Sequence, residues 1–94
     1  MATIGVLTLE IVLQNSHSLK DKRHVVKSLK DRLRGKFNVA VAEIDCQDLW
    51  QRAVLAAVPV SSDHGHAEKV LQSVEEEAAA LLGPELTGAT VEWM

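Results

Sequence analysis

The sequence predicts a single α+β domain with strands and helices in the order βαββαβ, and three observations support this. Segments 3–13 and 37–44 alternate their apolar residues with the period of two that is typical of strands. Segments 19–35 and 67–81 repeat apolar residues at helical spacing. A chain of 94 residues suits one domain that spans residues 1–94.

The first strand and the first helix are clearly marked. Polar residues QNSHS follow the strand, and Ser18 with Asp21 resembles a capping box, so we expect the helix to begin near Leu19. Gly35 suits the end of this helix. The strand face expected in the core carries Leu7, Leu9, Ile11 and Leu13, and the apolar helix face carries Leu19, Val26, Leu29 and Leu33.

The rest of the chain supplies the remaining elements. We expect further strands at 37–44, 50–60 and 87–94, with Pro59 near the end of the middle one because proline cannot donate to a ladder. Gly83 and Pro84 should stop the second helix. This order is the split βαβ arrangement of ferredoxin-like folds, in which two helices cover one face of a four-stranded antiparallel sheet.

The face of the sheet opposite the helices is unusually apolar. Both faces of the first and third strands carry apolar residues, among them Ile4, Val6, Val12, Val54, Val58 and Val60. An antiparallel sheet with one solvated face should alternate more cleanly. Scattered exposed valines are one interpretation. A partner that covers the face, most simply a second copy of the chain, is the other, and from it we expect a homodimer.

Composition indicates a soluble cytoplasmic protein without membrane contact. The single Cys46 cannot form an intramolecular disulfide and fits a reducing compartment. No apolar run approaches the ~20 residues of a membrane-spanning helix. The first residues lack a basic leader and include Glu10, which favours a strand over a signal peptide.

Positive charge is concentrated in one segment. Residues 20–36 hold eight of the ten Lys and Arg residues against two acidic ones, a net charge of +6, whereas the rest of the chain carries −9. Five of these cations form a line at helical spacing, here called the basic stripe: Lys20, Arg23, Lys27, Lys30 and Arg34. We expect Asp21 and Asp31 on the far side of the helix, so an anionic partner or acidic residues elsewhere should offset the repulsion.

The sequence predicts a polyanion-binding site on this helix. Its N-terminus favours an anion, which Ser18 could help to surround. The predicted site consists of Ser18, Lys20, Arg23, Lys27, Lys30 and Arg34. Contact with RNA, pairing with an acidic protein surface and an ordinary solvated helix are the three interpretations. The exposed face of the first strand has no aromatic residue for base stacking, so RNA contact would involve phosphates and depend steeply on salt.

Lys22 differs from the basic stripe. It falls between Val26 and Leu29 on the helix and therefore faces the sheet. We expect its aliphatic stem to pack in the core and its ammonium to pair with a carboxylate such as that of Glu43. Lys22 and Glu43 are thus a predicted structural pair.

Enzymatic interpretations have little support in the sequence. Glu43, Asp45 and Asp48 could hold Mg²⁺ or share a proton, although a polar hairpin loop explains the aspartates equally well. The HGH triplet at 64–66 lacks a third metal ligand, and Cys46 lacks an evident base. We expect no cofactor, metal site or catalytic residue, with a small metal-dependent enzyme as an alternative hypothesis.

Three motifs resemble one known family. SLKDKR (18–23), VVKSLKDRLRGKFNVAVAE (25–43) and DLWQRA (48–53) closely resemble the YlxP-like family of small bacterial proteins, strongly over residues 4–60 and more loosely through the second helix. The resemblance implies a ferredoxin-like fold, without an established activity. The motif positions are Ser18, Leu19, Lys20, Lys22, Arg23, Glu43, Asp45, Asp48, Trp50 and Gln51; they suit a buried Lys22–Glu43 contact and a structural Trp50.

These observations favour a non-catalytic binding module. The genes of the family often lie near those for translation initiation and ribosome maturation, which makes ribosomal RNA the expected anion. The resulting hypothesis is contact with RNA or ribosomal phosphates through the basic helix 18–35. The alternative is a self-associating structural or adaptor domain with no nucleic-acid role.

Overall fold

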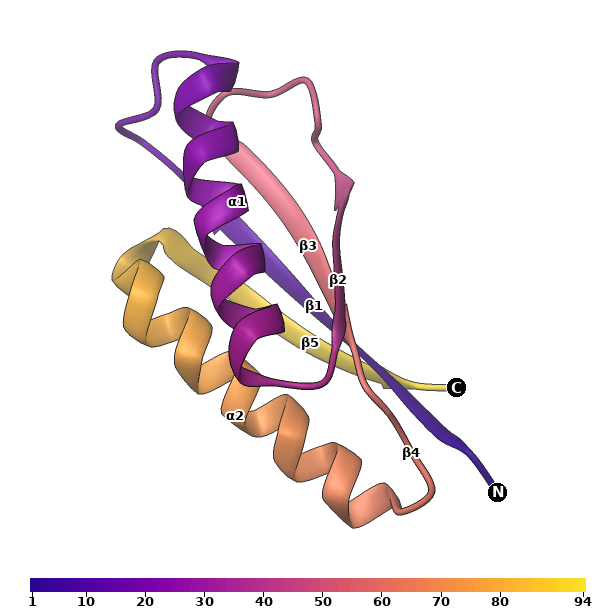
Figure 1. Ribbon diagram of the computed structural model, residues 1–94. Helices are drawn as coiled ribbons and strands as arrows, with labels where there is room; N and C mark the ends of the chain where they lie inside the picture. Colours follow the sequence, from indigo (N-terminus) through magenta and orange to yellow (C-terminus); the bar gives the residue numbers. More distant parts are fainter.

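A computed structural model describes residues 1–94, and in it two helices pack on one face of an antiparallel sheet (Figure 1). The elements are β1 (Thr3–Val12), α1 (Leu19–Lys36), β2 (Ala40–Asp45), β3 (Arg52–Val58), β4 (Val60–Ser61), α2 (His64–Leu82), a single 3₁₀ turn (Gly83–Glu85) and β5 (Leu86–Trp93). The predicted ferredoxin-like arrangement is confirmed, with the short β4 as an addition. Neither helix combines the length and apolarity that a membrane crossing requires.

The extra strand β4 is a continuation of β3 beyond Pro59. Both pair with β1 in the same antiparallel register, since Leu7 lies opposite Ala57 and Ile4 opposite Val60. Pro59 has no N–H to donate and therefore interrupts the ladder between them. The strand predicted at 50–60 is thus one line of chain that the proline divides.

The central strand β1 has β3 and β4 along one side and β5 along the other, while β2 forms the outer edge beside β3. The helix α1 lies over β2 and β3, and α2 lies over β1, β4 and β5. Fifteen buried apolar residues form one core between the helices and the sheet. They include all four leucine and isoleucine positions predicted for β1: Leu7, Leu9, Ile11 and Leu13.

The ends of α1 differ in detail from the sequence prediction. Ser18 Oγ accepts a hydrogen bond from Asp21 N at 3.1 Å, as expected of an N-cap. The Asp21 carboxylate accepts from His17 N at 3.0 Å instead of completing the capping box at Ser18. The helix continues through Gly35 to Lys36, and Phe37 N donates to Leu33 O, so β2 begins at Ala40 rather than at Phe37.

The face of the sheet opposite the helices is covered by no other part of the chain. Both helices lie on the other face (Figure 1). Neighbouring strands shield its apolar side chains only in part: Ile4, Val6, Val12, Val54 and Val58 are half-buried, and 61% of Val60 is exposed. The apolar character that the sequence predicts for this face is therefore present in the folded chain.

Gly5 lies where β1 passes beneath an aromatic ring. A Cβ atom at this position would come within 2.7 Å of a ring carbon of Trp93 and within 2.8 Å of Leu71 Cδ1. Both distances are shorter than van der Waals contact, so a side chain here must displace its neighbours. Glycine at position 5 is what allows β5 and α2 to close over this end of β1.

We therefore expect Gly5→Ala to lower the free energy of unfolding by about 1–3 kcal/mol through overpacking. Gly35→Ala is the matched control, because no atom lies within 4 Å of its Cβ position and alanine suits a helix. Urea unfolding of both variants measures the difference. Equal stability of Gly5→Ala and the parent would contradict the packing of Trp93 over Gly5.

Candidate functional site

Two loops meet at one end of the molecule, beside the start of α1 (Figure 1). They are the β1–α1 loop (13–18) and the β2–β3 loop (46–51), together called the loop end below. Gln51 connects them, because its Nε2 donates to Gln14 O and Ser16 O, each at 3.3 Å, while Leu13 N donates to Gln51 O at 2.9 Å. The motif positions of the sequence resemblance all lie in these loops or in the adjoining ends of α1 and β2.

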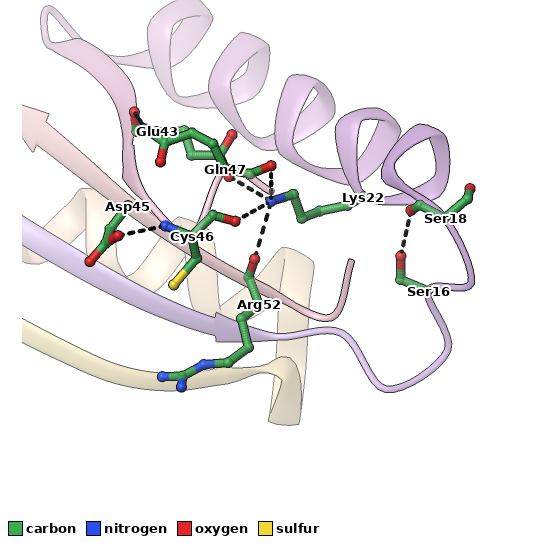
Figure 2. A network of polar contacts seen from close by, with 8 residues as sticks. All are labelled: Ser16, Ser18, Lys22, Glu43, Asp45, Cys46, Gln47 and Arg52. Carbon is green, nitrogen blue, oxygen red and sulfur yellow. Dashed lines mark hydrogen bonds and ion pairs between the residues drawn. The ribbon is translucent and has the colours of Figure 1, made fainter. Parts of the chain in front are cut away.

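Lys22 anchors the loop end from inside. Only 1% of its side chain is exposed, and Nζ donates to three backbone oxygens, those of Cys46 (2.7 Å), Gln47 (3.1 Å) and Arg52 (3.3 Å) (Figure 2). Glu43 Oε2 lies 3.0 Å from the same nitrogen and makes no hydrogen bond. Since an ammonium has only three N–H bonds, the three carbonyls accept all of its hydrogen bonds, and the Glu43 carboxylate balances its charge.

The β2–β3 loop directs its carbonyls inward through an unusual backbone conformation. Cys46 has φ of 62°, in the left-handed region that residues other than glycine rarely adopt. Cys46 N donates to Asp45 Oδ1 at 2.8 Å, and Cys46 O accepts from Leu49 N at 3.0 Å as well as from Lys22. The local turn and the buried ammonium thus hold Cys46 in a conformation that costs roughly 1–2 kcal/mol.

Two of the acidic residues near this loop have contacts within this part of the structure. The Glu43 carboxylate faces the Lys22 ammonium, and Asp45 Oδ1 accepts a hydrogen bond from Cys46 N. The chain holds no group of three or more His, Cys, Asp or Glu side chains placed to bind one metal ion. The arrangement therefore explains two of the three carboxylates as parts of the loop's own structure.

The basic stripe lies on the flank of α1 that is turned away from α2. The opposite flank carries Arg32 and Lys36, which contact the Glu77 carboxylate of α2 at 3.0 and 2.8 Å. The hydrogen bonds from Lys36 and Arg32 lower the pKa of Glu77 from its ordinary value of 4.5. Since the stripe follows the other side of the helix, it lies toward the edge strand β2. Four of its residues are exposed and Lys30 is half-buried.

The position expected for Asp31 was wrong. Its Oδ2 lies 2.6 Å from Lys27 Nζ and its Oδ1 lies 3.7 Å from Arg34 Nη2, because residues four and three positions apart are neighbours on the surface of a helix. The hydrogen bond from Lys27 lowers the pKa of Asp31 below 3.8, and the charge of Arg34 acts in the same direction. Both pairs are exposed to solvent, which weakens them.

The remaining predicted residues fall into two groups. Lys20, Arg23 and Lys30 make no ion pair within the chain, so their charges have no close internal counterion. The Ser18 hydroxyl caps α1, and Ser18 O accepts from the Ser16 hydroxyl at 3.1 Å (Figure 2). Ser18 therefore lies beside the cations but has a structural role at the helix start.

Three exposed apolar residues in or next to the β2–β3 loop were not recognised as exposed from the sequence. The exposed fractions are 50% for Ile44, 48% for Leu49 and 54% for Trp50. Residues 48–52 line a shallow hollow of about 430 Å³. The interpretation of Trp50 as a structural residue does not agree with this exposure. The sequence offered one signal of this exposure, which is that Trp50 lies in a loop. Outside strands, the alternation of apolar and polar residues no longer indicates which side chains are buried.

Replacing Lys22 by methionine should lower the free energy of unfolding by about 3–5 kcal/mol, because it leaves a shielded carboxylate unpaired and three inward carbonyls without a donor. Lys20→Met is the matched control, two residues away on the exposed face, and should change stability by no more than about 0.5 kcal/mol. Chemical denaturation measures both. Similar stabilities for the two variants would show that Lys22 does not anchor the loop end.

Comparison with solved structures supports the fold. A de novo designed protein, Foldit4, matches with a TM-score of 0.54 and 13% identity, covering 100% of this chain and 94% of that one. The designed protein LFR1 1, with a ferredoxin fold, matches at 0.52 with 15% identity over 100% and 84%. A dimeric ferredoxin-like protein of unknown function from Thermobifida fusca YX matches at 0.50 with 13% identity over 97% and 90%. At these identities the likeness shows the fold alone.

Comparison of sequences identifies the family. A family model described as "Protein of unknown function (DUF503)" matches residues 4–90. "Uncharacterized protein YlxP" of Bacillus subtilis (strain 168) is 42% identical over 71 residues, which are 76% of this chain and 77% of the relative. These matches confirm the resemblance in SLKDKR and the motifs after it. Because the family model spans most of the chain, the protein belongs to the DUF503 family and is YlxP-like.

Proposed function

We propose that the protein is a non-catalytic binding module whose basic stripe contacts the phosphates of RNA. The observation that carries the proposal is the one-sided charge of α1. Five cations line the flank turned away from α2, and Asp31 is the single acidic residue that pairs with them. A surface of this kind attracts a polyanion whatever its sequence, because phosphate contacts release counterions.

The N-terminal half of α1 is the better candidate for the first phosphate contacts. Arg32 and Lys36 share Glu77, and Lys27 and Arg34 share Asp31. No carboxylate pairs with Lys20 or Arg23, which lie within the first turns of the helix. Charge without an internal counterion is the charge available to a partner.

Binding of single-stranded RNA should weaken steeply with salt. With about four phosphate contacts, the logarithm of the binding constant should fall against the logarithm of salt concentration with a slope near −2.8. Lys20→Glu/Arg23→Glu should make this slope shallower by about 1.4, since two contacts are lost. Fluorescence anisotropy of a labelled RNA at several salt concentrations measures the slope.

Lys69→Glu is the matched control, because Lys69 is exposed on α2 and lies outside the basic stripe. It should leave the slope unchanged. Asp31→Asn adds an opposite test: removal of the one internal carboxylate should strengthen binding. Absence of RNA binding at low salt, or equal loss in the Lys69 control, would overturn the proposal.

Self-association is a second candidate function, and the uncovered apolar face of the sheet favours it. Half-buried valines of β1 and β3 share this face with Thr8 and the exposed Glu10 of β1, and β2 adds Ala40 and Ala42. A face of this kind is usually covered by a partner. The Thermobifida fusca protein of the same fold is dimeric, which supports a homodimer here. A dimer would also place two basic stripes in one particle.

Val6→Glu should convert such a dimer to a monomer, because it places a charge in the middle of the face. Ala42→Glu tests the same face at an exposed position, and Ala79→Glu on α2 is the control. Light scattering coupled to size-exclusion chromatography measures the mass. A parent protein that stays monomeric at high concentration would eliminate this candidate.

A further inference from the structure

Trp50 is a large aromatic side chain in an exposed position that the fold does not use. The exposed fraction of Trp50 is 54%, and the chain shows no aromatic pair that involves it. Trp93, by contrast, packs over Gly5 and contacts the His64 ring at a centroid distance of 4.1 Å with the ring planes tilted by 47°. Trp93 is 38% exposed and packs against the fold with the rest of its surface, whereas Trp50 is the more exposed of the two tryptophans.

The loop that carries Trp50 is held firmly at both ends. Before it, the carbonyls of Cys46 and Gln47 accept hydrogen bonds from the buried ammonium of Lys22. After it, the Gln51 side chain donates hydrogen bonds to the β1–α1 loop. Arg52 O accepts a hydrogen bond from Lys22 Nζ (Figure 2). An aromatic residue on a pre-organised loop can bind a partner without first paying the entropy of ordering that loop.

The same anchor brings the loop of Trp50 to the end of α1 that carries the cations without an ion pair. Lys22 joins the β2–β3 loop to the first turns of α1, where Lys20 and Arg23 lie on either side of it in the chain. Gln51 joins the same loop to the residues that lead into Ser18. An aromatic ring and unneutralised cations are therefore brought to one end of the molecule.

We propose that Trp50 stacks on an unpaired base of single-stranded RNA whose phosphates lie along the basic stripe. Proteins that bind single strands combine a positively charged track for the backbone with aromatic side chains for the bases. The inference rests on the proposed function, because the cations supply the phosphate contacts. It adds a preference for single-stranded over duplex RNA, since only an unpaired base offers its face to the ring.

Three probes separate the contributions of base and phosphate: oligouridine, the same strand annealed to oligoadenylate, and inorganic polyphosphate, which has no bases. Trp93→Phe leaves Trp50 as the single tryptophan, whose fluorescence should be quenched by oligouridine and not by polyphosphate. Trp50→Leu keeps an apolar residue but removes the ring, and should weaken oligouridine binding roughly 5- to 150-fold. Trp50→Phe should restore part of the affinity.

Trp50→Leu should leave polyphosphate binding and the thermal midpoint unchanged, because the side chain is more than half exposed. If Trp50→Leu binds oligouridine as tightly as the parent while Lys20→Glu/Arg23→Glu does not, the stacking inference fails and the proposed function stands. If no probe binds at low salt, both fail. If the parent is a dimer and Trp50→Leu is a monomer, a second copy covers the ring, and this result also overturns the inference.

Discussion

The buried ammonium of Lys22 is the interaction on which the loop end depends. A charge withdrawn from water requires compensation, and here it receives one carboxylate and three backbone carbonyls. The carbonyls belong to both sides of the β2–β3 loop, so the position of that loop follows the position of α1. The β1–α1 loop is in turn bound to Gln51. Two irregular segments thereby acquire a defined shape around a single nitrogen atom.

The charge of α1 is divided between its two flanks. Toward α2, Arg32 and Lys36 meet Glu77 and help to join the helices. Away from α2, Asp31 is the one acidic residue that pairs with the basic stripe, and Lys20 and Arg23 in the first turns of the helix make no ion pair. The overall charge of −3 conceals this division, because most acidic residues lie outside the helix. An electrostatic property of one surface can therefore oppose that of the whole molecule.

Most of the fold could be predicted from the sequence, because periodicity indicates which face of an element is apolar. The four large residues of β1, the helix start at Ser18 and the inward direction of Lys22 all follow from spacing. The division of the strand at Pro59 could be predicted only in part. A proline indicates a missing hydrogen bond, but it does not show that the chain beyond it pairs with β1 in the same register. The expectation for Asp31 was wrong although the spacing was available, since Asp31 lies four residues after Lys27 and three before Arg34 and is therefore their neighbour on the helix.

The contacts of the loop end could not be predicted in the same way. They depend on backbone oxygens, which every residue possesses and which no sequence pattern distinguishes. An anchor that binds backbone oxygens has a further consequence, because it places little demand on the side chains it holds. A substitution at an exposed position such as Gln47 or Trp50 would therefore change the surface chemistry of the loop while its backbone trace persists. A change in what the loop binds would then require the substitution of only a few solvent-facing residues, and the buried contacts would stay as they are.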